Sequence, residues 1–505
     1  MSGNGSILES ISPDTPLANL IGGEEVPSQA TETVAVTNPA TGATIATVPL
    51  STPAEVDAAL AAAQAAYLEW RKVPAVNRAR YLFRLHRLIE ENFEDLSRLC
   101  TLENGKTLEE SRGEVIRTLE NVEMAAGIPS LQMGDFAADI AAGFDETMIR
   151  EPLGVFAQIA PFNFPSMVPW WFAPYALATG NSYVIKPSPQ APLSQMELAR
   201  LVLEAGFPPG VLTILHGGTE VGEALCAHPQ VQGVSFVGST PVARSVYAAA
   251  SANGKRAQCQ GGAKNFLVVL PDAVMDAAVS NMMGSIFGCA GERCLAGSNI
   301  IAVGEAYEPL KERLVATTEA IALGDGLDPA TGMGPVISRE AQERIVGYVD
   351  GAEAEGATVI VDGRGATVEG HPDGYWVGPT LLEGVTMDMK IAREEVFGPA
   401  VNLIRMDTLY EAIAAIEASE FGNAASIYTS HGGAAREFAQ RVDIGNVGVN
   451  VGVAAPMAFF PFSGRRASFF GDLHGQGGNA VQFFTDAKVV ITRWPECTDG
   501  REPWD

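Results

Sequence analysis

Between residues 155 and 270 the chain alternates short apolar runs with stretches of helical pattern, and this alternation constrains the fold more than any other feature of the sequence. The runs are Ser182–Ile185, Val211–Leu215, Val234–Val237 and Phe266–Leu270. Each has the length of a buried strand. Strands that alternate with helices form a parallel sheet with helices on both faces. A second set of strand-like runs follows from Asn299 to Val453, so we expect two α/β domains.

The residues before this region are predicted to be largely helical. Thr52-Pro53-Ala-Glu55 combines an N-cap threonine, a proline at the first helical position and a capping-box glutamate, which predicts a helix start. A second helix is expected to continue past Leu96 and to stop near Gly105, and a third is expected over Leu108–Ala126. Ser194-Gln-Met-Glu197 has the capping-box pattern and predicts another helix start.

Composition excludes several classes of function. A chain of 505 residues is too long for one core, and its 47% hydrophobic residues are enough to build large ones. The net charge of -27 argues against nucleic acid or an anionic membrane as a partner. The most apolar stretch, Phe164–Ala178, is interrupted by prolines and is too short to span a bilayer. An anionic ligand would therefore have to be met by locally placed cations.

Cysteine and histidine usage points to a reducing compartment and no metal. The six cysteines are scattered without a CxxC pair, and the opening MSGNGSILES lacks a basic and apolar signal, so we predict a cytoplasmic protein. The six histidines show no metal-ligand spacing. We therefore expect no metal site.

Phe287–Ala296, FGCAGERCLA, is the segment whose residues are best suited to catalysis. Only the thiolate form of cysteine attacks carbon, and a neighbouring guanidinium lowers the thiol pKa. Arg293 directly precedes Cys294, so Cys294 is a candidate nucleophile with a lowered pKa. The alternative is that both cysteines of this segment are small buried hydrophobes.

Two strand ends could contact a phosphate-bearing ligand. Phe236-Val-Gly-Ser-Thr240 passes from a strand through Gly238 and Ser239 into a helix, and such a turn offers free N–H groups to an anion. Any strand-to-helix turn can use glycine, so this motif alone is weak. Lys186 ends another strand, at the edge where parallel sheets place ligand contacts, but it could equally be a solvated lysine.

Three further residues are candidates for handling a carbonyl or a carboxylate. Asn163 lies between aromatics and prolines in Pro161-Phe-Asn-Phe-Pro165, and a rigid carboxamide can donate to a developing oxyanion; the alternative is a turn-capping asparagine. Arg117 and Arg293 could bind a substrate carboxylate, because the guanidinium group binds carboxylates in a bidentate manner. For Arg117 an ordinary salt bridge on a glutamate-rich helix is the alternative.

Taken in order, these motifs resemble those of the aldehyde dehydrogenase superfamily. The set is NPATG, PFNFP, VIKP, FVGST, QGGAKN, GERC, EEVFGP and VGVN, and the resemblance runs from about Asn38 to Trp494. It implies that Cys294 is the nucleophile and that Asn163 forms the oxyanion hole with the Cys294 backbone N–H. It also implies a set of residues that bind the dinucleotide, namely Ala160, Phe162, Lys186, Gly238, Ser239, Glu395 and Phe397.

The resemblance implies an α/β fold made of a Rossmann-like cofactor domain, a catalytic domain and a β arm that joins subunits. We expect a flexible leader over residues 1–16. The dinucleotide-binding domain should comprise residues 17–134 and 152–260, and the catalytic domain residues 261–475. Residues 135–151 and 476–505 should form the oligomerisation arm and tail of a homodimer or homotetramer, with Asp135–Met148 pairing with Val481–Trp494.

Two positions depart from the general family pattern. Gln260 stands where most members have the glutamate that activates the hydrolytic water, and an amide cannot accept a proton at neutral pH. Pro189 stands where a glutamate usually bonds the adenine ribose, so NAD is a family expectation and NADP is not excluded. One branch, the CoA-acylating methylmalonate-semialdehyde dehydrogenases, also lacks the first glutamate, and its carboxylate-binding arginines match Arg117 and Arg293.

We therefore predict an NAD-dependent oxidation of a small aldehyde that carries a carboxylate, with coenzyme A as the acyl acceptor. The product would be propionyl-CoA from methylmalonate semialdehyde or acetyl-CoA from malonate semialdehyde, with loss of CO2. The first alternative is a hydrolytic NAD(P)-dependent aldehyde dehydrogenase that produces a carboxylic acid. A more remote alternative is a non-catalytic dinucleotide-binding protein.

Overall fold

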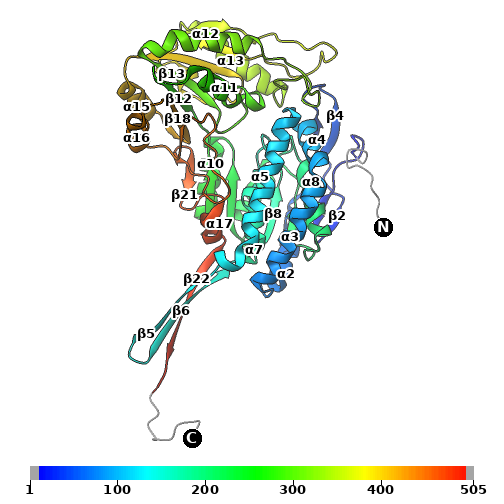
Figure 1. Cartoon of the computed structure of the whole chain (residues 1–505). Coiled ribbons are helices and arrows are strands. Elements are labelled where there is room, and N and C mark those ends of the chain that lie inside the picture. Colours follow the sequence, from blue (N-terminus) through cyan, green and yellow to red (C-terminus); the bar gives the residue numbers. More distant parts are fainter. Residues whose placement is uncertain (1–10, 496–505) are drawn as a thin grey trace.

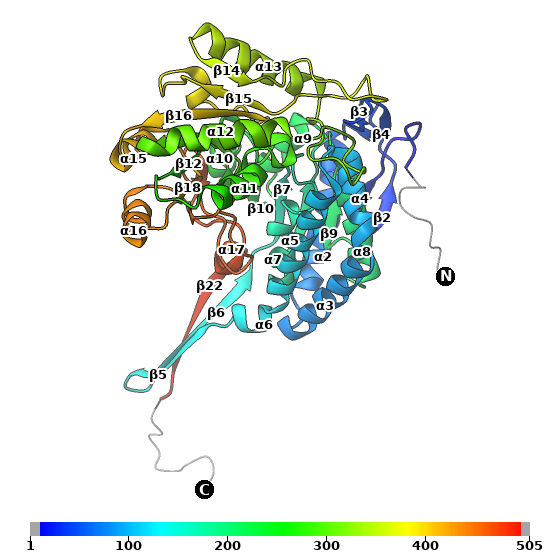
Figure 2. The same cartoon turned by 45° about the horizontal axis from the view of Figure 1, so that its top comes forward.

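The chain, seen in a computed structural model, consists of two α/β layers and a protruding β arm (Figures 1 and 2). The structure describes residues 11–495. The start of the predicted leader and the end of the predicted tail, including Cys497, lie outside the described residues. Pro16, at the end of the predicted leader, forms a β-bridge with Thr47. Over residues 11–495, none of the helices has the length and apolar character needed to cross a bilayer.

The first sheet contains the predicted parallel strands. Its order is β2-β1-β9-β8-β7-β10-β11-β21. The central strands β7 (Val155–Ile159), β8 (Ser182–Lys186), β9 (Leu212–Ile214), β10 (Val231–Val237) and β11 (Arg256–Gln260) pair in parallel. The antiparallel edge strands are β1 (Asn19–Ile21), β2 (Glu24–Val26) and β21 (Phe469–Gly471). The predicted α/β architecture is confirmed.

Helices cover both faces of this sheet. One face packs against α2 (Pro53–Trp70), α9 (Thr219–Ala227) and α10 (Thr240–Ala252). The other packs against α3 (Ala75–Glu91), α5 (Leu108–Ala126), α7 (Ala173–Thr179) and α8 (Leu193–Glu204), with α4 (Phe93–Asn104) and α6 (Ile128–Leu131) alongside. Each helix puts an apolar stripe onto the sheet, which is the main source of its stability.

Local signals decide where some of these helices begin. The capping box at Thr52 is confirmed: its side chain accepts from the Glu55 N–H, and the Glu55 carboxylate accepts from the Thr52 N–H. The helix expected up to Gly105 is divided at Asn92 into α3 and α4. The prediction of a capping box at Ser194 is wrong. The Ser194 N–H and hydroxyl both donate to the buried Glu103 carboxylate, and α8 begins at Leu193.

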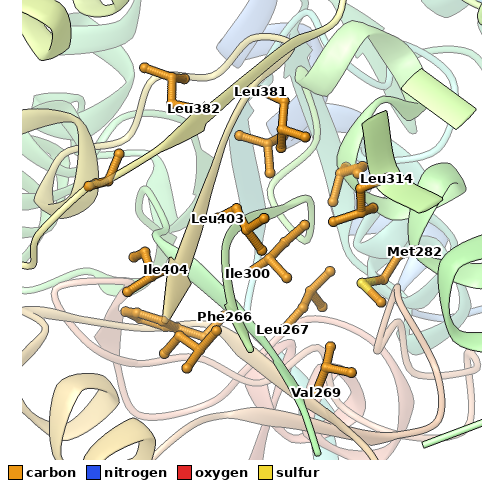
Figure 3. Packing of buried hydrophobic residues seen from close by; sticks show 14 of the residues in the cluster. Phe266, Leu267, Val269, Met282, Ile300, Leu314, Leu381, Leu382, Leu403 and Ile404 are labelled. Atoms are coloured by element: carbon orange, nitrogen blue, oxygen red, sulfur yellow. The ribbon is translucent and has the colours of Figure 1, made fainter. Parts of the chain in front are cut away.

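The second sheet has the order β14-β15-β16-β13-β12-β18-β19. Its parallel members are β12 (Asn265–Val269), β13 (Gly297–Val303), β15 (Thr380–Glu383), β16 (Ala400–Met406), β18 (Ala424–Tyr428) and β19 (Asn446–Val449), and β14 (Thr358–Val361) is antiparallel. Its apolar core lies between the sheet and α11 (Met275–Ile286), α12 (Tyr307–Glu319), α13 (Arg339–Ala354), α15 (Leu409–Ala418) and α16 (Gly432–Arg441). Figure 3 shows Phe266, Ile300 and Leu403 within this core.

The chain crosses between the two layers at one place. It leaves the first sheet after β11 and returns to it through β21, which lies inside the range predicted for the catalytic domain. The two crossings touch, because the Gly261 N–H donates to the Ser468 carbonyl at 2.8 Å. Thr240 Oγ1, at the start of α10, also holds the returning crossing by donating to the Ala467 carbonyl at 2.8 Å. The second layer is therefore an insertion whose entry and exit are bonded together.

The arm is a three-stranded antiparallel sheet that projects from the body (Figure 1). It consists of β5 (Asp135–Ala141), β6 (Phe144–Pro152) and β22 (Thr485–Arg493), and β22 pairs with β6 along its whole length. Its exposed apolar side chains include those of Phe136, Ile140, Val489, Ile491 and Trp494. Such a surface is typical of protein–protein contacts, and the oligomerisation role of the arm stays a prediction.

Candidate active site

Cys294 follows a tight left-handed turn. Cys289, Ala290 and Gly291 have φ values of 52°, 50° and 72°, although only glycine adopts this conformation without strain. Gly291 also has no room for a side chain, because a Cβ there would lie 2.3 Å from the Gly398 carbonyl oxygen. The turn connects α11 to β13 and brings Cys294 to the junction of the two layers.

Two cavities meet at Cys294. The first, which we call the α5 cavity, has a volume of about 280 Å³ and is lined by residues of α5, by Phe164 and by the segment Val453–Phe462. The second, which we call the α10 cleft, has a volume of about 660 Å³ and is lined by residues at the carboxyl ends of β7 and β10 and at the start of α10. Cys294 lines both. A thiol in this position can contact ligands bound on either side.

The sequence-based expectation for the Cys294 pKa is wrong. Burial raises the pKa of its thiol to about 12, and the nearby Glu395 carboxylate adds to the rise. Arg293 and the backbone N–H groups of Cys294 and Leu295 oppose this rise but do not cancel it. A guanidinium next to the thiol in sequence therefore does not by itself produce a thiolate, because removal from water disfavours the charged form.

Asn163 lies beside Cys294 in the wall of the α10 cleft, on the loop that follows β7. It is buried, and its Nδ2 donates to the Glu292 carbonyl at 3.0 Å. The amide thus contacts the backbone two residues before the nucleophile candidate, and its second hydrogen has no partner among the described residues. The structure brings the two predicted catalytic residues together, and the oxyanion role stays a prediction.

A buried ion pair, which the sequence reasoning missed, holds the Asn163 loop. Lys106 and Glu114 are both fully buried, with Nζ and Oε2 2.7 Å apart. Lys106 Nζ also donates to the Asn163 carbonyl at 2.6 Å, and Glu114 Oε1 accepts from the Ser166 and Met167 N–H groups at 2.7 and 2.9 Å. The available signal was a lysine that follows Asn104-Gly105, in a tight connection between two helices.

Arg117 and Arg293 both line the α5 cavity, as their predicted role requires. Arg117 Nη1 lies 2.7 Å from Glu120 Oε2 and also contacts the Met457 sulfur. Arg293 is half-buried in the wall; its Nη1 donates to the Gly284 carbonyl at 3.1 Å, and its Nε has no partner among the described residues. The salt bridge that was the alternative for Arg117 is thus present, in the cavity wall.

The cavity also contains carboxylates, each of which is held by a donor. Glu114 is paired with Lys106, and Glu120 with Arg117. Glu110 accepts from the Cys289 N–H at 2.6 Å and from the Thr107 N–H at 2.9 Å. Each glutamate therefore already has a hydrogen-bond donor within the protein. Arg293 is not paired with any of these carboxylates, and its positive charge is available to a ligand in the cavity.

Most of the predicted cofactor residues line the α10 cleft: Ala160, Phe162, Gly238, Ser239, Glu395 and Phe397. The rings of Phe162 and Phe397 meet edge to face with centroids 5.9 Å apart. Gly238 is needed because a Cβ there would lie 2.6 Å from the Phe236 ring, and a Cβ at Gly262 would lie 2.5 Å from Glu395 Oε2. The cleft is thus shaped by small residues at a strand-to-helix turn.

Two predicted residues lie behind the walls. Lys186 is buried, and its Nζ donates to the Pro187 and Gly217 carbonyls at 3.1 and 3.0 Å, so that it is not among the residues that line the cleft. Gln260 is also buried: its Nε2 donates to the Phe462 carbonyl at 3.3 Å, and its Oε1 has no partner among the described residues. Gln260 thus supports a segment that lines the α5 cavity.

Two glutamates near Cys294, the half-buried Glu395 and the buried Glu292, have raised pKa values. Burial raises the pKa of Glu395 to about 7, although its carboxylate accepts from the Ala263 N–H at 2.9 Å and lies near Lys264. Burial raises the pKa of Glu292 to about 8, against the opposing hydrogen bond from the Ile337 N–H. Glu395 is therefore a group beside Cys294 that can gain or lose a proton near neutral pH.

The fold and this site define the class of protein. The model of the aldehyde dehydrogenase family matches residues 26–490, and the chain belongs to this family. A malonate-semialdehyde dehydrogenase of Halalkalibacterium halodurans (strain C-125) is 48% identical over 478 residues, which cover 95% of this chain and 98% of the relative.

Solved structures place the chain in the same part of the family. The crystal structure of a methylmalonate-semialdehyde dehydrogenase from Oceanimonas doudoroffii has a TM-score of 0.94 and 42% identity, and the match covers 96% of this chain and 99% of that chain. A Sinorhizobium meliloti 1021 protein solved in complex with NAD has a TM-score of 0.94 and 40% identity, with coverage of 96% and 99%. The predicted family and fold are confirmed.

Proposed function

We propose that this enzyme is an NAD-dependent, CoA-acylating dehydrogenase of methylmalonate or malonate semialdehyde. The observation that carries the proposal is the position of Cys294 between a cavity with two arginines and a cleft with the predicted cofactor residues. The names of the similar proteins support the substrate class. A semialdehyde of this class has an aldehyde at one end and a carboxylate at the other. The α5 cavity contains Cys294 for the aldehyde and the two arginines for the carboxylate.

The residues of the α10 cleft fit a dinucleotide. The cleft volume of about 660 Å³ lies within the usual range for cofactor sites. The start of α10 at Gly238 and Ser239 presents the positive end of a helix to an anion. When bound there, NAD supplies the acceptor for the hydride that leaves the substrate carbon.

The charges of the cleft favour NAD over NADP. Among the described residues that line it, the one cation is Arg344, and its Nη1 donates to the Val396 carbonyl. Ser188 and Gln190, on either side of Pro189, line the cleft with neutral side chains. A 2′-phosphate would carry about two negative charges, and Arg344 is the one cation among these lining residues that could meet them.

The chain's own residues account for the first chemical steps. The nearby Glu395 carboxylate, whose pKa is near 7, accepts the proton of the Cys294 thiol, and the resulting thiolate Sγ adds to the aldehyde carbon and forms a thiohemiacetal. The free N–H of the Asn163 amide and the Cys294 backbone N–H donate to the resulting oxyanion. Arg117 and Arg293 hold the carboxylate at the other end. Loss of the hydride leaves a thioester on Cys294, and the carboxylate β to its carbonyl can leave as CO2, with a proton replacing it on carbon.

The acyl group then needs an acceptor, and we propose the thiol of coenzyme A. Gln260 cannot take a proton from water at neutral pH, and it lies behind the cavity wall. Attack by the CoA thiolate forms acetyl-CoA or propionyl-CoA and returns the Cys294 thiolate. A hydrolytic reaction remains the second candidate, because the carboxylate of Glu395 lies near Cys294 and has a pKa near 7.

One experiment separates these candidates. NADH production from methylmalonate and malonate semialdehyde is followed with and without CoA, and the products are identified by mass spectrometry. We expect multiple turnovers and acyl-CoA only when CoA is present. A steady-state rate independent of CoA, which falls in Glu395→Gln, would establish the hydrolytic enzyme. Failure to form any NADH would favour the non-catalytic dinucleotide-binding protein.

We further propose a cytoplasmic homodimer or homotetramer, with residues 17–134 and 152–260 as its dinucleotide-binding domain and 261–475 as its catalytic domain. The exposed apolar side chains of the arm support self-association through β22. Sedimentation of the full chain and of Ile491→Lys, an exposed arm position, would test this. A mass unchanged by the substitution would remove the arm from the interface.

A further inference from the structure

Gln476 combines three features that the proposed reaction does not use. Its backbone has φ 69° and ψ 165°. Its side chain lines the α5 cavity together with Arg117 and Cys294. Its Oε1 is buried without a hydrogen-bond partner among the described residues. Each feature costs stability, so their coincidence in the wall of a reactive cavity calls for a functional account.

The backbone conformation of Gln476 belongs to a region that only glycine adopts readily. Its neighbours are glycines for visible steric reasons: a Cβ at Gly475 would lie 2.7 Å from the Phe172 ring, and one at Gly477 would lie 2.7 Å from the Phe459 carbonyl oxygen. In His474-Gly-Gln-Gly-Gly478 a further glycine would suit the backbone better than glutamine. The glutamine is therefore kept for its side chain.

The Gln476 side-chain amide is buried and has unused hydrogen-bonding capacity. The residue is only 3% exposed, and the structure gives its Nε2 no hydrogen bond within residues 11–495. A buried donor without a partner is unfavourable unless a bound molecule accepts its hydrogen bond. A carboxylate can accept from Nε2, although it cannot donate to Oε1, and the cavity also contains Cys294, so a carboxylated substrate is the ligand that Nε2 can reach.

The arginines leave a place for a third donor. Arg117 shares Nη1 between Glu120 and the Met457 sulfur, and Arg293 directs Nη1 and Nη2 to the Gly284 carbonyl and the Cys289 sulfur. A carboxylate accepts about four hydrogen bonds. A neutral amide adds a donor without attracting the neighbouring glutamates as a further cation would.

We propose that Gln476 is a substrate-binding residue whose Nε2 donates to the carboxylate of the semialdehyde, beside Arg117 and Arg293. The inference rests on the proposed function. It explains why a strained position carries an amide, and it gives the cavity a means to hold the carboxylate end so that the aldehyde end reaches Cys294 Sγ.

The test compares two substitutions on two aldehydes. Gln476→Gly relieves the backbone and removes the amide, and Gln476→Glu keeps the shape but places a carboxylate against the substrate. We expect Gln476→Gly to raise KM for malonate semialdehyde about tenfold, with KM for propanal unchanged and a thermal midpoint equal to or above that of the wild type. Gln476→Glu should raise KM for malonate semialdehyde further, because like charges repel.

The matched control is Gln232→Ala, at an exposed position of β10 away from both cavities, which should change neither KM. A wild-type enzyme that prefers malonate semialdehyde, together with both Gln476 variants that retain this preference, would overturn the inference. Equal losses on both aldehydes would also overturn it, since they indicate a structural role. A wild-type enzyme with no preference for the carboxylated aldehyde would instead contradict the proposed function.

Discussion

The α5 cavity and the α10 cleft share Cys294 but differ in what forms their walls. The cavity has an apolar lining that also includes the charged side chains of Arg117, Arg293 and Glu110. Arg117 is paired with Glu120, and the other two are held by backbone groups. The cleft is shaped by glycines such as Gly238 and Gly262, which allow close approach. The comparison supports the proposal that the cavity binds the charged substrate, whereas the cleft binds the dinucleotide through close approach and the dipole of α10.

The strongest test removes the residue that the two cavities share. Cys294→Ala should lower turnover by more than about 10³-fold, because the covalent route is lost while both binding sites remain. Stopped-flow absorbance should show an NADH burst in the wild type and none in the variant. Cys289→Ala, at a buried cysteine of the same turn, is the control and should keep the burst. A burst in Cys294→Ala would assign the nucleophile elsewhere.

The second test concerns the wall between the cavities. Asn163→Ala should lower kcat about 10²–10³-fold with little change in KM, since an oxyanion donor acts in the transition state. Asn104→Ala is a suitable control, because Asn104 holds the same loop through the Phe162 carbonyl at 3.1 Å. Comparable losses of kcat in both variants would mean that the loop, and not the Asn163 amide, is what matters.

The third test addresses charge recognition in the cavity. Arg117→Leu should raise KM for malonate semialdehyde about 10–100-fold, the usual effect of losing a hydrogen bond to a charged group, and should leave propanal nearly unaffected. Arg112→Leu, on the same helix but paired with the exposed Glu94, provides the control. Equal effects of Arg117→Leu on the two aldehydes would remove the carboxylate role.

The smallest effect is on stability and follows from Glu292. Its raised pKa means that the folded protein binds a proton which the unfolded chain releases between the ordinary glutamate value and about pH 8, so stability falls as pH rises across this window. Glu292→Gln stays neutral, and it should gain about 1–2 kcal/mol relative to the wild type between pH 5 and pH 8. Urea unfolding at both pH values measures this difference, and a gap that does not widen with pH would contradict the raised pKa.

The sequence analysis predicted the cleft more completely than the cavity. The motif around Gly238 and Ser239 is contiguous, and the order of strands and helices already places such a turn at the edge of a parallel sheet. The cavity is assembled from α5, the segment Val453–Phe462 and Gln476, which lie far apart in the chain. Of these, Arg117 was a candidate from guanidinium chemistry and was then matched by the family resemblance, whereas Gln476 has no motif to mark it.

Burial explains the remaining errors. The pKa of Cys294 depends on how completely both layers exclude water from it, which a neighbouring arginine in the sequence does not reveal. Lys106 carried no signal in the sequence, and Ser194 was predicted to cap its own helix, yet each binds a buried glutamate of a neighbouring helix, Glu114 of α5 and Glu103 of α4. Local sequence patterns predicted most helices and strands. The hydrogen-bond and ion-pair partners of buried side chains became clear only from the three-dimensional structure.

The bonded entry and exit of the second layer have a consequence for engineering. Residues 262–467 begin and end at the same place, the junction where the Gly261 N–H bonds the Ser468 carbonyl. In a circularly permuted form of residues 262–467, a short linker would join the two original ends, and the new ends would lie in an exposed loop. Domains whose ends lie close together tolerate circular permutation. Beside this junction the Gly262 N–H donates to Thr240 Oγ1 at 2.9 Å, and Gly262 lines the α10 cleft, so a graft made there would first disturb that cleft.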